Sequence, residues 1–387
     1  MFVTQTAAMN AVEQTRMPPG VVILYSPNEL YGCRHEQATH VEAARRLAVL
    51  KGFDFAGEYD PSSCYPGPVY FVPGDTLVGV EAAETLGIRS EHDLFGGVAP
   101  HAFVATKAIT HSLIEPTALA PMGWSHEFGR RVRDVALRGF TAFTVEDARL
   151  AGFRLLQHGP VRLKSVRATA GRGQAVVHDT AGLEVALSAM DGAELSGYGL
   201  VLEEDLAEVT TYSVGQVRGA DIVATYYGTQ RLTPDNGGAS VYGGSNLIVA
   251  RGGFGALLAL DPPEEARLAV AQARTYDAAA MECFPGLFAS RRNYDIARGQ
   301  DATGRWRCGV LEQSWRIGGA SGAEIAALEA FQAEPGLRAV RAATVELYGE
   351  SEAPSLPPHA TVYFRGLDER VGAITKYAVV EAYDDPR

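Results

Sequence analysis

The chain has 387 residues, enough for two or three subdomains with a sizeable core. Hydrophobic residues make up 47% and charged residues 21%, which is typical of a soluble globular protein. The formal net charge of −12 argues against nucleic acid or an anionic membrane as the main partner. The sequence contains no run of about 18 apolar residues, the length that a membrane-spanning helix needs.

The four cysteines are scattered along the chain and form no C-x-x-C pair. This pattern is typical of a protein in the reducing cytoplasm, and it argues against a zinc site or a disulfide framework. We therefore expect a cytoplasmic location and a fold held together by its hydrophobic core.

The first third of the chain alternates between strand and helix patterns. Residues 21–25 and 68–72 are short apolar runs that predict buried strands, whereas residues 36–50 and 80–86 have helical periodicity. The alternation predicts a Rossmann-like subdomain over residues 19–105 with a parallel sheet.

The loop after the first strand is a candidate substrate site, because ligands bind beyond the carboxyl ends of parallel strands. Arg34 and His35 lie there and could contact a substrate. The alternative is a solvated start of the following helix.

Residues 93–115 lead from a glycine-rich loop through a short strand into a predicted helix, with Lys107 just before that helix. A lysine in this position is either a surface residue or a ligand for an anion. Residues 127–138 and 147–157 predict two further helices.

A glycine-containing loop follows the strand that carries Lys164. Glycines permit a close backbone approach and positive φ, so N–H groups in the loop could surround phosphate oxygens. The loop residues in question are Gly171, Arg172 and Gly173. It is not a Walker A loop, since it contains no G-K-[ST]. The alternative is a plain β-hairpin with a glycine turn.

Residues 200–206 predict a strand that ends in acids, and residues 212–232 predict two more strands. The polar, glycine-rich segment 233–254 is predicted to be a loop, and loops of this kind often carry function. The candidates for holding an anionic substrate in or beside it are Arg231, Asn246 and Arg251. An exposed mobile loop is the alternative. A helix is predicted over residues 264–282.

Residues 291–319 predict two strands joined by a turn between Gly299 and Gly304. Asp295 and Glu312 could face each other across this hairpin. Side chains two residues apart share a face of a strand, so Ser314 and Arg316 would lie on the face of Glu312. Carboxylates can hold Mg²⁺ and a guanidinium can hold anionic oxygens. The alternative is a surface hairpin with alternating charges.

The C-terminal part contains a predicted helix over residues 323–332 and a segment, 337–347, that could be strand or helix. Residues 360–383 predict a final hairpin. This hairpin could pack against the core or form the edge through which two copies make a homodimer.

The pattern D…turn…LExxxRxGG between Asp295 and Gly319 resembles the last strands of the ATP-grasp superfamily. The strand and loop at Lys164 and the acidic strand 200–206 fall in the order which that superfamily requires, so the resemblance covers about residues 100–330. It implies an α/β and α+β fold, with the Rossmann-like subdomain followed by a two-lobed ATP-grasp domain. The implied lobes are residues 106–205 and 206–335, with a C-terminal extension over 336–387.

The resemblance also implies how ATP is bound. Lys107 and Lys164 would hold its phosphates together with the glycine loop. The strand 200–206 would be the hinge between the lobes, where the backbone binds adenine and an acid binds the ribose. The hinge candidates are Glu203, Glu204, Leu206 and Glu208. Thr211 stands where the superfamily usually has glutamate, so Glu208 would take over that contact.

The implied metal ligands are Asp295, Glu312 and Ser314, with Mg²⁺ as the ion, and Arg316 would steady the transferred phosphoryl group. Ser314 stands where asparagine is usual and is a weaker ligand. The implied reaction is ATP-dependent activation of a small-molecule carboxylate as an acyl phosphate, which an amine or similar nucleophile then attacks. Two alternatives remain: a catalytically weak nucleotide-binding protein and an unrelated α/β enzyme.

Overall fold

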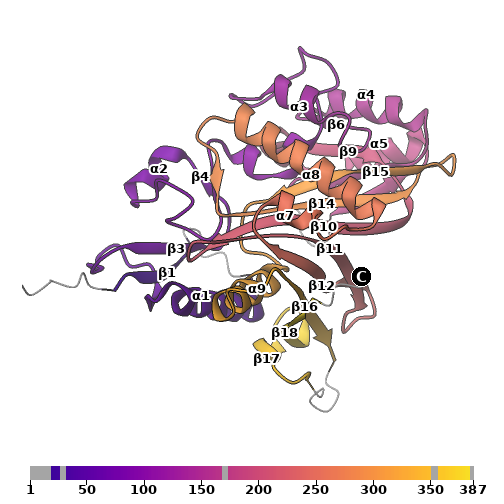
Figure 1. Cartoon of the computed structure of the whole chain (residues 1–387). Coiled ribbons are helices and arrows are strands. Elements are labelled where there is room, and N and C mark those ends of the chain that lie inside the picture. The colour runs from indigo at the N-terminus through magenta and orange to yellow at the C-terminus, as the bar shows by residue number, and fades with distance from the viewer. Residues whose placement is uncertain (1–18, 27–31, 168–172, 350–355, 384–387) are drawn as a thin grey trace, which may run out of the picture.

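The structure, a computed structural model, describes residues 19–26, 32–167, 173–349 and 356–383. Within these ranges the strands form four sheets, of which the largest has eight strands (Figure 1). None of the described helices is both long and apolar enough to cross a membrane.

The N-terminal sheet is parallel, with the strand order β2-β1-β3. Its elements are β1 (Val21–Tyr25), α1 (Arg34–Lys51), β2 (Asp54–Glu58) and β3 (Val69–Pro73). Successive side chains of β1 enter two different hydrophobic cores, so the strand is buried on both faces as its apolar run predicts. β2 was not predicted, because its residues DFAGE contain neither an apolar run nor a regular alternation of apolar and polar side chains.

A second small sheet, of order β13-β5-β4, joins the N-terminal subdomain to a later part of the chain. Its elements are β4 (Leu77–Val78), α2 (Val80–Thr85), β5 (Gly97–Ala99) and β13 (Phe288–Ala289). The prediction of an α-helix after Lys107 is wrong. Two short 3₁₀ turns, η1 (Ala102–Ala105) and η2 (Lys107–Thr110), occupy this segment because Thr106 and His111 take extended backbone conformations.

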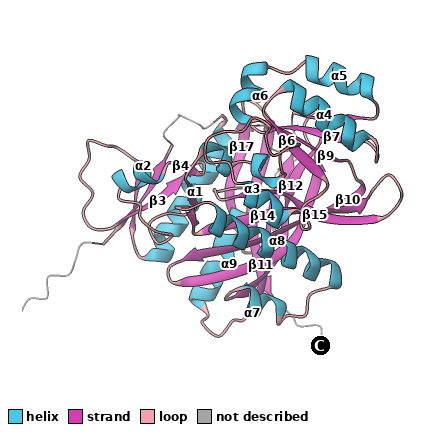
Figure 2. Cartoon of the chain, turned by 90° about the horizontal axis from the view of Figure 1, so that it is seen from above, coloured by secondary structure: helices cyan, strands magenta, loops and turns pink. Residues whose placement is uncertain are grey.

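The next segment forms a small lobe around an antiparallel sheet of order β6-β9-β7-β8 (Figure 2). α3 (His126–Val132) precedes it and packs against α8 (Glu264–Cys283) in a different core. The elements of the small lobe are β6 (Gly139–Ala142), α4 (Val145–Leu156), β7 (Val161–Ser165), β8 (Gln174–Val177), α5 (Thr180–Ser188), α6 (Gly192–Tyr198) and β9 (Leu200–Glu204). Thr144, Asp179 and Asp191 begin α4, α5 and α6 by accepting a backbone hydrogen bond of the first turn. Apolar residues of α4 and α5 pack on this sheet to form its core.

The large lobe is built on an antiparallel sheet of order β15-β14-β10-β11-β12-β16-β18-β17. Its strands are β10 (Ala207–Gly219), β11 (Ile222–Pro234), β12 (Ser240–Arg251), β14 (Arg291–Gln300), β15 (Trp306–Ser314), β16 (Ala339–Tyr348), β17 (Thr361–Asp368) and β18 (Gly372–Ala382). The predicted C-terminal hairpin is present and continues this sheet. β17 is the edge strand at this end of the sheet, so a second copy could pair with it. The homodimer remains a prediction.

The glycine-rich segment predicted to be a loop is largely strand β12, near the middle of the large sheet. Alternate residues Ser245, Leu247 and Val249 point into the protein and are buried. A side chain at Gly244 would overlap the backbone of β16, so glycine is required here by the close approach of two strands. The polar composition concealed a strand whose pairing with both neighbours is tertiary.

Helices lie on opposite sides of the large sheet (Figure 1). On one side α8 (Glu264–Cys283) and the short α7 (Phe254–Leu258) form a core with β10, β11 and β14. On the other side α9 (Ser321–Ala333) and α1 form a second core. The structure therefore has the predicted α/β and α+β architecture.

A buried ion pair fastens α9 to the sheet. The Arg291 side chain is 2% exposed and the Glu324 side chain 0%, with Nε of Arg291 2.9 Å from Oε2 of Glu324. The same guanidinium donates to the carbonyl oxygens of Ser314 and Arg316. One side chain thus holds a helix, a strand and the segment that follows β15.

We expect Arg291→Met to lower the free energy of unfolding by about 3–5 kcal/mol, because it leaves the Glu324 carboxylate buried without its partner. Chemical denaturation followed by circular dichroism measures the loss. Arg149→Met is the matched control, since it breaks an exposed pair with Glu184 and should leave the midpoint unchanged. An equal, small effect of both substitutions would contradict the role given to the buried pair.

Candidate active site

Two carboxylates face each other on the hairpin formed by β14 and β15. Asp295 pairs directly with Glu312, and Asn293 pairs with Ser314. Directly paired residues point to the same face of a sheet, so all four side chains lie on one side of the hairpin. The strand register thus places the two acids opposite each other, as expected from the sequence. Arg316 lies beyond the end of β15 and is not part of this face.

Lys107 approaches this carboxylate pair from η2. Its Nζ atom lies 3.0 Å from Oε2 of Glu312, and the lysine side chain is buried. The structure thus brings together a predicted phosphate ligand and a predicted metal ligand that are 205 positions apart (312 − 107).

The electrostatics around Asp295 suit a divalent cation. Burial raises the pKa of Asp295, and the neighbouring charge of Glu312 raises it further. Asn293 opposes this effect by donating an amide hydrogen bond of 2.9 Å to Oδ1 of Asp295. Two hard oxygen ligands that repel each other are the donor set that Mg²⁺ stabilises, so these residues fit that ion.

Ser314 has a less favourable environment for a metal. Its Oγ accepts a hydrogen bond of 3.1 Å from the buried guanidinium of Arg291. A positive charge at this distance disfavours a cation on the same oxygen. The guanidinium of Arg316 donates to the carbonyl of Ile317 and lies 3.5 Å from the carboxylate of Asp75.

A chain of buried hydrogen bonds connects Asp295 to Glu324 on α9. The hydroxyl of Tyr226 lies 2.5 Å from Oε1 of Glu324 and 3.0 Å from Oδ1 of Asn293, which in turn contacts Asp295. Burial raises the pKa of Tyr226 well above its usual value, and the charge of Glu324 adds to this, so the hydroxyl remains a donor. A side chain at Gly215 would overlap this hydroxyl.

The small lobe contains a second charged cluster. Both oxygens of Glu203 are engaged: Oε1 pairs with the Lys164 ammonium, and Oε2 lies 3.2 Å from Nε2 of His111. Burial alone would raise the pKa of Glu203, but Lys164 and His111 outweigh it and lower the pKa to about 2. A Cβ atom at Gly139 would lie 2.7 Å from the His111 ring, so this glycine makes room for the histidine.

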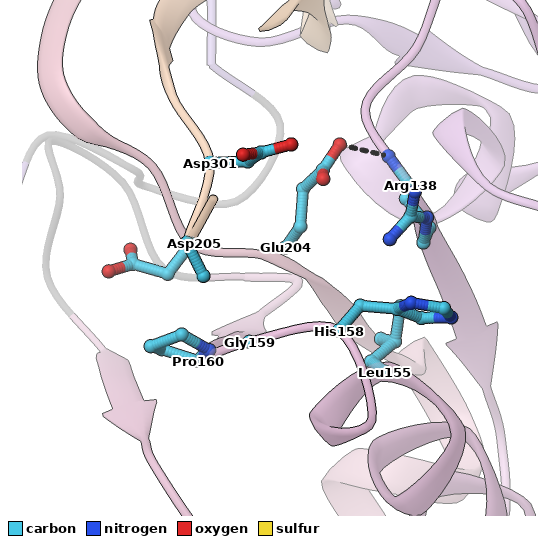
Figure 3. A pocket seen from close by; sticks show the side chains of 9 residues that line it. Arg138, Leu155, His158, Gly159, Pro160, Glu204, Asp205 and Asp301 are labelled. Atoms are coloured by element: carbon cyan, nitrogen blue, oxygen red, sulfur yellow. Dashed lines mark hydrogen bonds between the residues drawn. The ribbon is translucent and has the colours of Figure 1, made fainter. Parts of the chain in front are cut away.

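Glu204 lies at the junction of the two lobes, beside a cavity of about 10 Å³ (Figure 3). Its Oε1 accepts the backbone N–H of Arg138 at 2.9 Å and contacts the guanidinium of Arg307 at 3.3 Å. Figure 3 shows Asp301, from the turn between β14 and β15, near this carboxylate. The cavity holds no more than about one water molecule.

The remaining nucleotide candidates are spread around this junction. Leu206 is buried with Leu137 and Ala297, whereas Glu208 has positive φ and accepts a hydrogen bond from Gln300. Gly173 has a φ of 62°, and its carbonyl accepts the backbone N–H of Ser165. The other two loop candidates, Gly171 and Arg172, lie outside the described residues.

The substrate candidates do not converge. Arg231 is exposed and donates to the carbonyl of Gly243, while Asn246 is exposed on the face of β12 opposite to Ser245. Arg251 donates to the carbonyls of Phe331 and Pro335 at the end of α9, which is a structural role. The following substrate candidates lie at the start of α1: Arg34, which is exposed, and His35, which is buried.

Comparison of the sequence with protein families gives one match. The family described as "Protein of unknown function (DUF3182)" matches residues 23–378. The chain belongs to this family. No curated protein matches this DUF3182 chain in sequence.

Solved structures show which fold the DUF3182 chain has. It is similar to a carboxyaminoimidazole ribonucleotide synthase from Aspergillus clavatus complexed with ATP (TM-score 0.50, 15% identity, 94% of each chain covered). It is also similar to a biotin carboxylase-beta-gamma-ATP complex from Campylobacter jejuni (TM-score 0.51, 10% identity, 94% of this chain and 88% of that chain covered). At 10% and 15% identity these likenesses show the fold alone, and the predicted two-lobed fold is confirmed.

Several residues of the site were absent from the sequence prediction. His111, Asn293 and Arg291 make the contacts that fix Glu203, Asp295 and Ser314. Asn293 could have been found, since it stands two residues before Asp295 and therefore on the same face. His111 could not, because 92 residues separate it from its partner.

We expect Glu203 to stabilise the fold at neutral pH by about 3 kcal/mol, following the lowering of its pKa to about 2 from its usual value near 4.5. Because the folded pKa is the lower one, this contribution is complete above about pH 4.5 and is lost as the pH falls towards 2. Urea unfolding at a series of pH values should show a shallower acid loss for Glu203→Gln than for the unaltered protein.

The matched control for this pH series is Glu184→Gln, which alters an exposed carboxylate of the same lobe. Its acid loss should follow that of the unaltered protein. Parallel curves for the unaltered protein and Glu203→Gln would contradict the assignment of a buried, ionised Glu203.

Proposed function

We propose that the protein is an ATP-dependent ligase that activates a small-molecule carboxylate as an acyl phosphate for attack by an amine or a similar nucleophile. The observation that carries this proposal is the direct pairing of Asp295 with Glu312, with the Lys107 ammonium 3.0 Å from Glu312. In an ATP-grasp fold this arrangement supports a site for polyphosphate and Mg²⁺. The titles of two similar structures name bound ATP or an ATP analogue.

The two lobes would divide the work of binding ATP. Lys164 can donate to phosphate as well as to Glu203, since an ammonium has three donors. The hinge backbone near Glu204 and Leu206 would bind the adenine edge. Because both oxygens of Glu203 are engaged, we assign the ribose contact to Glu208, which is exposed at the start of β10.

Asp295 and Glu312 would hold Mg²⁺, which neutralises phosphate charge when it is bound. The work of the chain is then positioning and charge stabilisation. Lys107 and Lys164 would orient the phosphates, so that the carboxylate of the substrate is in line with the terminal phosphate. Arg316 would stabilise the charge of the transferred group.

A second candidate is a nucleotide-binding protein with little catalysis. The contact between Arg291 and Ser314 favours it, because this contact leaves the site with two clear metal ligands, Asp295 and Glu312. Release of phosphate from ATP in the presence of carboxylic acids separates the two candidates. The small-molecule partners, the cytoplasmic location and the homodimer remain predictions.

We expect MgATP to stabilise the protein by about 2.7 kcal/mol at one hundred times its dissociation constant. Glu312→Gln should abolish most of this stabilisation, because it removes one metal ligand and the partner of Lys107. Thermal unfolding with ATP, with Mg²⁺ and with both together measures the effect as a shift in Tm for each protein.

Glu282→Gln is the matched control, because Glu282 is an exposed carboxylate on α8 that pairs with Arg131. It should keep the full response to MgATP. A response of Glu312→Gln equal to that of this control, or a shift that does not need Mg²⁺, would remove the basis of the proposal.

A further inference from the structure

The outer face of α8 carries few charges for a helix on the surface. Ala271 and Ala278 are exposed on it. Between Arg267 and Glu282, a stretch that the structure describes completely, Arg274 is the only exposed charged residue. The solvent-facing side of a surface helix usually carries charged and polar residues. This face therefore has the composition of a contact surface rather than that of a solvated one.

A groove follows this face where α3 runs beside α8. The rings of Phe128 on α3 and Tyr276 on α8 pack against each other, with 5.1 Å between their centroids. The groove has a volume of about 590 Å³. The distance between two packed helices depends on the side chains at their contact, so small residues here permit a close approach. The following residues line the groove: Arg131, Ala271, Arg274, Thr275, Ala278, Ala279 and Glu282.

Three residues of this face form a ridge with opposite charges at its two ends. Arg274, Ala278 and Glu282 follow one another at steps of four residues, and such rows are the ridges by which helices pack. A two-fold rotation about Ala278 exchanges the ends of the ridge. It places Arg274 of each chain against Glu282 of the other, with a small side chain at the crossing point. The ridge is therefore complementary to itself, as a symmetric dimer contact requires.

Contacts within the chain leave both charged ends of the ridge accessible. Glu282 pairs with Arg131, yet 62% of the Glu282 side chain is exposed. A carboxylate has about four lone-pair sites, so it can accept a second guanidinium. The Arg274 guanidinium lies 5.8 Å from the centroid of the Phe254 ring, and Arg274 is exposed. Both groups can thus form a further ion pair.

We infer that this face of α8 is the interface of a homodimer, in which the two copies of α8 cross at Ala278. Arg274 of each chain pairs with Glu282 of the other. The two ridges then pack at the crossing angle of about 50° that rows with a step of four favour. The occupant of the groove is accordingly a second copy of this chain.

The interface lies on the side of the large sheet away from the metal carboxylates. Tyr294 and Ile296 enter the core beneath α8, so Asp295 between them points to the other face. Dimerisation through α8 therefore leaves the carboxylates accessible, and the inference does not depend on the proposed reaction.

The edge strand β17 is the competing surface for a second copy. Its pairing with β18 shifts in register between Val362 and Phe364. Such irregularities are one of the means by which proteins keep edge strands from pairing with other chains. This feature favours α8, which is a regular helix along the whole ridge.

Sedimentation velocity of the full chain over a range of concentrations tests the interface. We expect a reversible equilibrium between monomer and dimer. Ala278→Glu should raise the Kd of the dimer at least tenfold, because it places two like charges against each other at the crossing point. Circular dichroism should show an unchanged fold, since position 278 is exposed.

Reversal of the charges tests the two-fold pairing itself. Arg274→Glu and Glu282→Lys should each raise the Kd at least tenfold, because like charges then meet at both ends of the ridge. A mixture of these two variants should form a heterodimer with a Kd near that of the unaltered protein. In the mixture each new charge meets its opposite, which no other placement of the two residues predicts.

Arg149→Glu and Glu184→Lys are the matched controls, because they make the same charge changes in an exposed ion pair of the small lobe. Both should dimerise as the unaltered protein does. The inference is overturned if the chain is a monomer at every concentration, or if Ala278→Glu dimerises as tightly as the unaltered protein. The second result would move the contact to another surface, such as β17. Single reversals that abolish the dimer and are not rescued in the mixture would also reject it.

Discussion

The buried ion pair between Arg291 and Glu324 is the constraint on which the large lobe depends. An ion pair without access to water is stable only when its remaining hydrogen-bonding groups are satisfied. Here Tyr226 satisfies the carboxylate, and the carbonyls of Ser314 and Arg316 satisfy the guanidinium. The position of α9, the end of β15 and the segment after it are therefore determined together.

The same network determines the geometry of the candidate site. Tyr226 passes the constraint to Asn293, and Asn293 orients the carboxylate of Asp295. The carboxylate pair thus stands on strands whose side chains are already fixed by the core, which is what a preorganised site needs. The cost is that Ser314 faces a guanidinium and is a poor ligand for a cation.

The sequence predicts those features that depend on local pattern. The apolar strand residues and the turn predicted between Gly299 and Gly304 identify the hairpin of β14 and β15, on which Asp295 and Glu312 were expected to face each other. Where tertiary pairing decides, prediction fails: β12 is a strand although its glycines and polar residues are typical of a loop. The contact of Lys376 with His35 spans 341 residues, so no local pattern could reveal it.

The tip of the β14–β15 hairpin touches the small lobe. A Cβ atom at Gly159 would lie 2.6 Å from Ala302, and Arg307 contacts Glu204 at the junction. Asp295 and Asp301 are six residues apart, about 20 Å along an extended strand. Because β14 pairs with β10 from Arg291 to Gln300, the hairpin is a rigid arm of the large sheet, and its tip sets where the small lobe stands relative to the carboxylates. A ligand that contacted both lobes would therefore meet two surfaces whose separation this arm determines.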